Sequence, residues 1–170
     1  KPMKKLAKPK SRKRPGKMAQ RPSKRIRRML FEFEYKSDPK EIAKVEPFLQ
    51  TINAAARLDD GTFYRLLVAG TEAINNGILH GNKSDPRKTV SVTCTFDSCE
   101  LVFRVKDQGK GFRPEDVPDP LEEKNLMKTS GRGIFLMRSL MDRVSFTVTP
   151  EGTIVELVID LKHLGLQQKF

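Results

Sequence analysis

Apolar and polar residues alternate in five short stretches of the chain, as they do in strands that bury one face. In the first stretch the aromatic residues Phe31, Phe33 and Tyr35 alternate with acidic residues. The gap at residues 150–152 contains a proline and a glycine, which predicts a tight turn between the last two stretches. The pattern predicts strands over residues 29–35, 89–96, 101–105, 143–149 and 153–161.

Apolar residues have helical spacing in three other stretches. Asp38 followed by Pro39 is a typical helix start, and this helix is expected to reach about residue 57 with an interruption or kink near Pro47. A second helix is expected from residues 59–62 to about residue 79, and a third over residues 132–141. This order predicts an α+β fold, a two-layer sandwich whose mixed, mostly antiparallel sheet carries its helices on one face.

The two cysteines fall in the central hairpin. A two-residue turn at residues 97–98 would pair Phe96 with Cys99 and Cys94 with Leu101, and would place every apolar residue on one face. The cysteines would then be diagonal neighbours in the core. No further cysteine or close histidine pair accompanies them, so the pattern favours free thiols in a reduced, cytoplasmic protein over a metal site.

The positive charge of the chain is concentrated at its beginning. The formal net charge is +12, and residues 1–30 hold 14 of the 33 basic residues and none of the 21 acidic ones. A segment so charged and so poor in large apolar residues is expected to be disordered, and it lacks the apolar run of a signal peptide or membrane span. It predicts either weak, salt-sensitive contact with nucleic acid or another polyanion, or a solubilising extension.

Glu72 and Asn76 are four residues apart in the second predicted helix, so their side chains share one face. That face lies away from the apolar side that contains Leu66 and Ile74. Taken alone, the pair indicates only a solvated helix face. Its interpretation as a ligand-binding pair depends on the two segments that follow.

Asp107 continues the alternation of the strand before it, so it points to the same side as the core residues. A buried carboxylate needs a hydrogen-bonding partner, and the exocyclic amine of adenine would serve. Gly109 and Gly111 would allow the backbone to turn and to approach a planar base closely. The alternative is an ordinary Asp-x-Gly turn.

Ser130, Gly131, Arg132 and Gly133 open the third predicted helix. The free N–H groups and the positive dipole end at such a start form a phosphate site, although a plain N-cap by Ser130 is the alternative. Residues 113–129, which precede this segment, are polar and contain three prolines. Long loops of this kind tend to be lids or binding loops.

In this order, with the polar segment between the last two, the three motifs resemble those of the anti-sigma-factor serine/threonine kinases of the GHKL, or Bergerat-fold, ATPase superfamily. The resemblance extends over about residues 31–161. It implies a histidine-kinase-like ATP-binding domain over residues 31–165, between the basic tail of residues 1–30 and a C-terminal tail of residues 166–170. It also implies ATP and Mg²⁺ as cofactors.

The resemblance assigns a role to each motif. Asn76 would hold Mg²⁺, Asp107 would read adenine, and Glu72 would be the general base for the attacking hydroxyl group. The nucleotide-binding set also includes the glycine segments, two cations near the γ-phosphate and the Gly-Thr element that closes the pocket. These residues are Gly109, Gly111, Lys128, Ser130, Gly131, Arg132, Gly133 and Thr153.

The resemblance implies a cytoplasmic kinase that phosphorylates a Ser or Thr of an anti-sigma-factor antagonist, with a sigma factor as a further partner. A homodimer is an open expectation, and no membrane contact is expected. Two alternatives stay open from the sequence. One is a nucleotide-binding interaction module without catalysis. The other is a polyanion-binding protein that acts through its tail.

Overall fold

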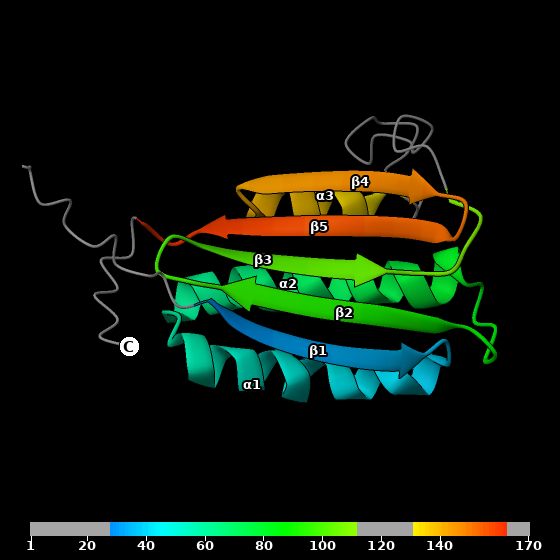
Figure 1. The fold of residues 1–170 in the computed structure, drawn as a ribbon, viewed down its shortest axis with the longest axis horizontal. Helices are drawn as coiled ribbons and strands as arrows, with labels where there is room; N and C mark the ends of the chain where they lie inside the picture. Colours follow the sequence, from blue (N-terminus) through cyan, green and yellow to red (C-terminus); the bar gives the residue numbers. More distant parts are fainter. Residues whose placement is uncertain (1–27, 112–130, 163–170) are drawn as a thin grey trace, which may run out of the picture.

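The computed structural model describes residues 28–111 and 131–162, which form a helical layer and a sheet layer (Figure 1). In chain order the elements are β1 Met29–Lys36, the 3-10 helix Pro39–Lys44, α1 Val45–Ala56, α2 Asp60–Asn75, the π-helix Asn76–Gly81, β2 Thr89–Phe96, β3 Glu100–Lys106, α3 Arg132–Leu140, β4 Arg143–Thr149 and β5 Gly152–Asp160.

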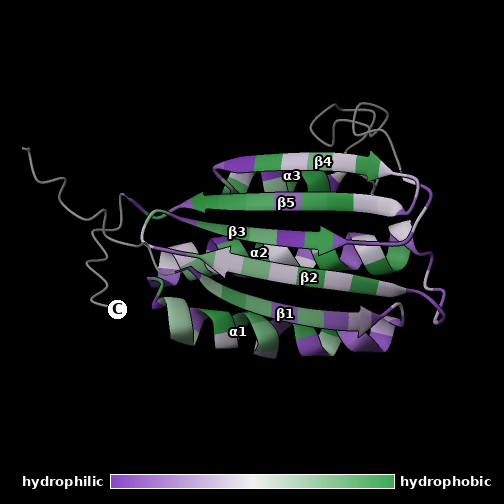
Figure 2. Ribbon diagram, viewed as in Figure 1, coloured by the Kyte–Doolittle hydropathy of each residue, from purple (hydrophilic) through white to green (hydrophobic). Residues whose placement is uncertain are grey.

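The five strands form one sheet in the order β1-β2-β3-β5-β4. All four neighbouring pairs are antiparallel, so the described part of the sheet is wholly rather than mostly antiparallel. The helices α1, α2 and α3 cover one face of it (Figure 1). Figure 2 shows the largely hydrophobic course of β5 and the hydrophilic end of β1. The predicted two-layer α+β sandwich is therefore confirmed.

The β2–β3 hairpin differs in register from its prediction. The Asp97 N–H donates to the Glu100 carbonyl over 3.1 Å, and the Asp97 carboxylate accepts from the Cys99 N–H over 2.7 Å. The turn residues are therefore Ser98 and Cys99, one position later than expected, and Phe96 pairs with Leu101. A one-residue shift of the turn moves the register by two residues, so the same side chains still face the core.

This shift separates the environments of the two cysteines. Cys94 is fully buried opposite Phe103, and burial raises the pKa of its thiol to about 12. Cys99 lies in the turn and is partly exposed. The prediction that both cysteines are core neighbours is therefore wrong for Cys99, because the Asp97 carboxylate holds it in the turn.

The first helical segment is interrupted near Pro47, as expected, although not at the proline itself. The 3-10 helix is capped by Asp38, whose carboxylate accepts from the Lys40 N–H, and it gives way to α1 at Val45. Pro47 lies in the first turn of α1, where a missing N–H removes no helical hydrogen bond. The break therefore precedes the proline.

Helix α2 carries Glu72 and leads directly into Asn76, and its start is fixed by Asp59. The Asp59 carboxylate accepts from the Thr62 hydroxyl over 2.7 Å and from the Thr62 N–H over 3.0 Å. These bonds lower the pKa of Asp59. At its other end α2 passes into the π-helix Asn76–Gly81, a wider turn that the periodicity of the sequence did not indicate.

The tails predicted at the two ends of the chain lie almost wholly outside the described residues. Of the predicted basic tail, only residues 28–30 belong to the described part, and residues 166–170 lie outside it. Among the described helices, none has the length and apolar character needed to cross a membrane.

We expect Asp59→Ala to lower the free energy of unfolding by about 1 kcal/mol at neutral pH, because the carboxylate caps α2. The pKa of Asp59 is lowered in the fold, so this stabilisation is present above the ordinary carboxylate pKa and is lost as the pH falls through the lowered value. Urea unfolding at neutral and strongly acidic pH measures both effects. Asp60→Ala is the control, and an equal loss in both variants would contradict the cap.

Candidate functional site

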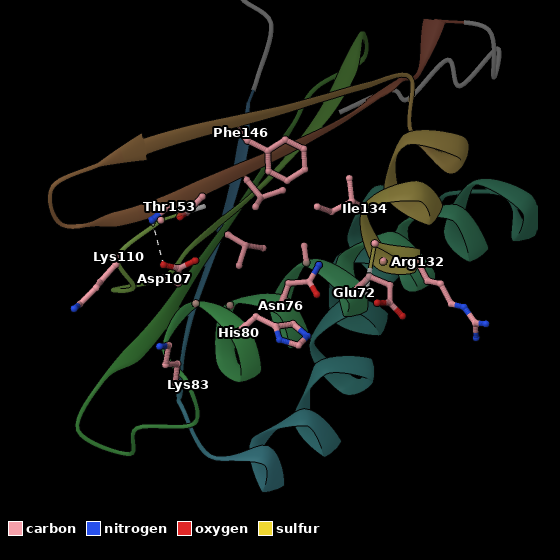
Figure 3. A pocket seen from close by; sticks show the side chains of 18 of the residues that line it. Glu72, Asn76, His80, Lys83, Asp107, Lys110, Arg132, Ile134, Phe146 and Thr153 are labelled. Atoms are coloured by element: carbon pink, nitrogen blue, oxygen red, sulfur yellow. Dashed lines mark hydrogen bonds between the residues drawn. The ribbon is translucent and has the colours of Figure 1, made fainter. Parts of the chain in front are cut away.

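A cavity of about 620 Å³ lies between the end of α2, the start of α3 and the near ends of β3 and β5 (Figure 3). One wall is apolar and includes Val105 and Val155, which pair across β3 and β5. The remaining walls carry polar groups and glycines. The cavity is lined by Glu72, Ala73, Asn76, Gly77, His80, Gly81, Lys83, Lys88, Val105, Asp107, Lys110, Gly111, Gly131, Arg132, Gly133, Ile134, Phe146, Thr153 and Val155.

Most of the site residues predicted from the sequence line this one cavity. Gly109 does not, and Lys128, Ser130 and the predicted lid of residues 113–129 lie outside the described residues. Four segments that are far apart in the sequence are thus brought together by the fold. The predicted residues on the cavity wall are Glu72, Asn76, Asp107, Gly111, Gly131, Arg132, Gly133 and Thr153.

Glu72 and Asn76 lie directly beside the start of α3. A methyl group on Gly133 would lie 2.7 Å from the Glu72 Oε2 atom and 3.2 Å from the Asn76 Nδ2 atom. Only a residue without a side chain therefore allows the α3 backbone this close to the pair. Figure 3 shows both side chains at the end of the cavity that Arg132 also borders.

The start of α3 is suited to an anion. Gly131 has φ +92° and leads into the first turn of α3, where backbone N–H groups point along the helix axis at the positive end of the helix dipole. The other end of α3 is anchored to α2, because the Arg65 guanidinium donates to the Leu140 carbonyl and pairs with Asp142 over 3.1 Å. The anchor fixes α3 relative to the helix that bears Glu72.

Asp107 is buried at the opposite end of the cavity. Its Oδ1 atom accepts from the Gly109 N–H over 2.8 Å and from the Thr153 N–H over 3.1 Å, the bond drawn in Figure 3. A methyl group on Gly81 would lie 2.5 Å from its Oδ2 atom. Backbone donors thus fix one oxygen of the carboxylate, and the glycine keeps space beside the other.

The hydroxyl group of Thr153 is a second polar group at this end. Its Oγ1 atom is buried and has no hydrogen-bond partner within the described part of the chain. Buried hydroxyl groups nearly always have a partner, so an unpaired one beside a cavity indicates a bound molecule or water. Together with Asp107 and the Val105–Val155 wall, it fits a planar, apolar group with polar edges.

Four basic or titratable residues of the cavity had no binding role predicted from the sequence. Lys83, Lys88 and Lys110 border it, as does His80, which belongs to the π-helix. The sequence could have indicated His80 and Lys110 by their closeness to the motifs. His80 follows Asn76 by one helical turn, and Lys110 separates two motif glycines. Lys88 and Lys83 reach the cavity only through the fold.

The comparisons with known proteins agree with this geometry. The family model described as the histidine kinase-like ATPase domain matches residues 35–159. The anti-sigma F factor of Anoxybacillus flavithermus is 30% identical over 139 residues, which cover 80% of this chain and 92% of that protein. The anti-sigma F factor of Bacillus subtilis is 29% identical over 140 residues, which cover 81% and 92% of the two chains.

A solved structure has the same fold. It is the histidine kinase domain from the blue-light activated histidine kinase of Erythrobacter litoralis EL346, with a TM-score of 0.50 and 20% sequence identity. The match covers 76% of this chain and 66% of that one. At this identity the likeness concerns the fold.

We expect Gly133→Ala to weaken nucleotide binding about tenfold, the size of one lost charge-assisted hydrogen bond, because the new methyl group displaces the Glu72 and Asn76 side chains. Calorimetric titration with ATP and Mg²⁺ measures the affinity, and circular dichroism checks the fold. Gly61→Ala, at the exposed start of α2, is the matched control. Equal affinity in the Gly133 variant and the parent would contradict this geometry.

Proposed function

The chain belongs to the histidine kinase-like ATPase domain family, and from this we propose that it is an ATP-dependent protein serine/threonine kinase that acts as an anti-sigma regulatory factor. Its acceptor would be a Ser or Thr of an anti-sigma-factor antagonist, and a sigma factor would be a further partner. The anti-sigma F factors with which the chain aligns over most of its length support this direction. A cytoplasmic location and a homodimer remain predictions.

One observation carries the kinase proposal. The Glu72 carboxylate lies beside the start of α3, where the backbone N–H groups and the positive end of the helix dipole suit a phosphate. A purely nucleotide-binding pocket needs no carboxylate there, since a negative charge beside phosphate opposes binding. Such a group is useful when a proton has to be removed next to the phosphate.

The residues of the cavity fit ATP and Mg²⁺. The base would lie at Asp107 and the unpaired Thr153 hydroxyl, against the apolar wall, and the phosphates would lie at the N–H groups of residues 131–133. Among the described residues, no three His, Cys, Asp or Glu side chains gather to hold a metal. The proposal therefore gives Mg²⁺ to the Asn76 carboxamide oxygen and the nucleotide phosphates, as is common for this ion.

Each residue then has a defined task. When bound, Mg-ATP supplies the γ-phosphoryl group, which ends on the acceptor hydroxyl oxygen with ADP as the leaving group. Glu72 orients that hydroxyl group and accepts its proton. Arg132 and the N–H groups at the start of α3 balance the charge of the phosphates. The hydrogen bond between Asp107 and Thr153 orients the adenine ring.

We expect Glu72→Gln to bind Mg-ATP as the parent does but to lose phosphoryl transfer by about 10²–10⁴-fold, because a positioned general base contributes this much. Asn76→Ala is expected to lose the Mg²⁺ dependence and nucleotide affinity together. Single-turnover transfer of labelled γ-phosphate to a candidate antagonist protein, at saturating ATP, separates the two variants. If the Glu72 variant transfers phosphate at the parental rate, Glu72 is not the general base. ATP binding by all three proteins without any transfer would favour the non-catalytic module.

We expect Asp107→Asn to weaken adenine nucleotide binding about tenfold or more while the protein remains folded, because the variant loses a charge-assisted acceptor for the base. Calorimetry with ATP gives the affinity and urea unfolding gives the stability. The adenine assignment fails if the affinity of the variant equals that of the parent.

A further inference from the structure

Asn82 lies directly after the π-helix, and only 1% of it is exposed. Its N–H donates to the Gly77 carbonyl over 2.8 Å. Its Nδ2 group donates to the Ser37 hydroxyl oxygen over 2.6 Å and to the Thr89 carbonyl over 2.9 Å. Its Oδ1 atom accepts from the Gln108 N–H over 2.7 Å. One buried side chain thus joins the end of the π-helix, the start of β2, the β1 end and the turn after β3.

Gln108 directly follows Asp107, so the Asn82 bond acts on the turn that carries the base-reading carboxylate. The two segments also touch through their backbones, since a methyl group on Gly109 would overlap the Gly81 carbonyl group. The glycines allow this close contact, but they have no side chains that could hold the two segments together by hydrogen bonds. Lys88 and Thr89, at the start of β2, also donate to Gln108. The bond that its N–H donates to Asn82 is the one that reaches the helical segment.

The two ends of the cavity belong to different elements. Asn76 and Glu72 lie on the helical segment that ends at Asn82, and Asp107 lies at the end of β3. A nucleotide spans only a limited range of lengths, so it engages both ends in one geometry only if their separation stays within that range. A buried hydrogen bond between the two segments is the kind of constraint that fixes such a separation.

We propose that Asn82 is a positioning residue that fixes the Asp107 turn against the helix bearing Asn76, and thereby sets the affinity and base preference of the cavity. This inference rests on the proposed binding of an adenine nucleotide. Asn82 does not itself line the cavity and acts on Asp107 through Gln108.

A double-mutant cycle tests the proposal. Asn82→Ala is expected to weaken Mg-ATP binding about tenfold in the parent, to lower its preference for ATP over GTP, and to have little further effect in an Asp107→Asn background. Calorimetry at low temperature, with circular dichroism of every variant, gives the four affinities. An equal loss in both backgrounds, or an unchanged ATP preference, would overturn the proposal in favour of a general role in folding.

Two further variants separate the bonds of Asn82. Ser37→Ala removes one partner on the side away from Gln108, so we expect lower stability with the ATP affinity of the parent. Asn82→Asp keeps the acceptor for the Gln108 N–H, so we expect an affinity within about threefold of the parent even where stability falls. If the Asn82→Asp variant folds but binds Mg-ATP tenfold more weakly than the parent, that result alone overturns the proposal, whatever the Asn82→Ala variant does. If the parent itself does not bind Mg-ATP, the proposed function fails instead.

Discussion

The buried Asp107 carboxylate is the constraint on which the rest of the site depends. A carboxylate among apolar strands is unfavourable unless donors reach it, and here the donors are the N–H groups of Gly109 and Thr153. Thr153 also accepts from the Asp107 N–H, so the end of β3 and the start of β5 are tied by two bonds. Gly152 makes this approach possible, because a methyl group there would overlap the Asp107 carbonyl group. The tie fixes the strand ends around one oxygen and leaves the other facing the space beside Gly81.

The same need for close approach explains the glycines around the cavity. Gly81, Gly109 and Gly133 each lie where a methyl group would meet a site residue or a backbone atom of a second segment. They bring helix, strand end and α3 within contact distance, yet they supply no hydrogen bonds from side chains. The polar side chains Asn82 and Arg65 supply those bonds, Asn82 to the turn after β3 and Arg65 to the far end of α3. The site is thus shaped by glycines and held by two buried or half-buried polar groups.

The sequence predicted the features that depend on local periodicity. Alternation placed Asp107 on the core side, and four-residue spacing placed Glu72 and Asn76 on one face. The hairpin register was missed because the Asp97 carboxylate selects the turn, a choice that alternation cannot distinguish from a shift by two residues. The π-helix has no hydrophobic period of its own. The network of Asn82 joins residues 37, 89 and 108, so nothing near residue 82 in the sequence could reveal it.

The two carboxylates of the cavity are held in contrasting ways, and this contrast is consistent with separate roles. Asp107 is buried and receives two backbone N–H bonds, so its orientation is fixed before any ligand arrives. Glu72 is half-buried on a helix and lines the cavity. None of the described residues donates a hydrogen bond to its carboxylate, which leaves it open to a ligand or acceptor. A group that recognises a base gains from being fixed, whereas a group that accepts a proton from an incoming hydroxyl must keep an open side. The strand end provides the first condition and the exposed edge of α2 the second. Under the proposed function, recognition and proton transfer would therefore lie on different layers of the fold.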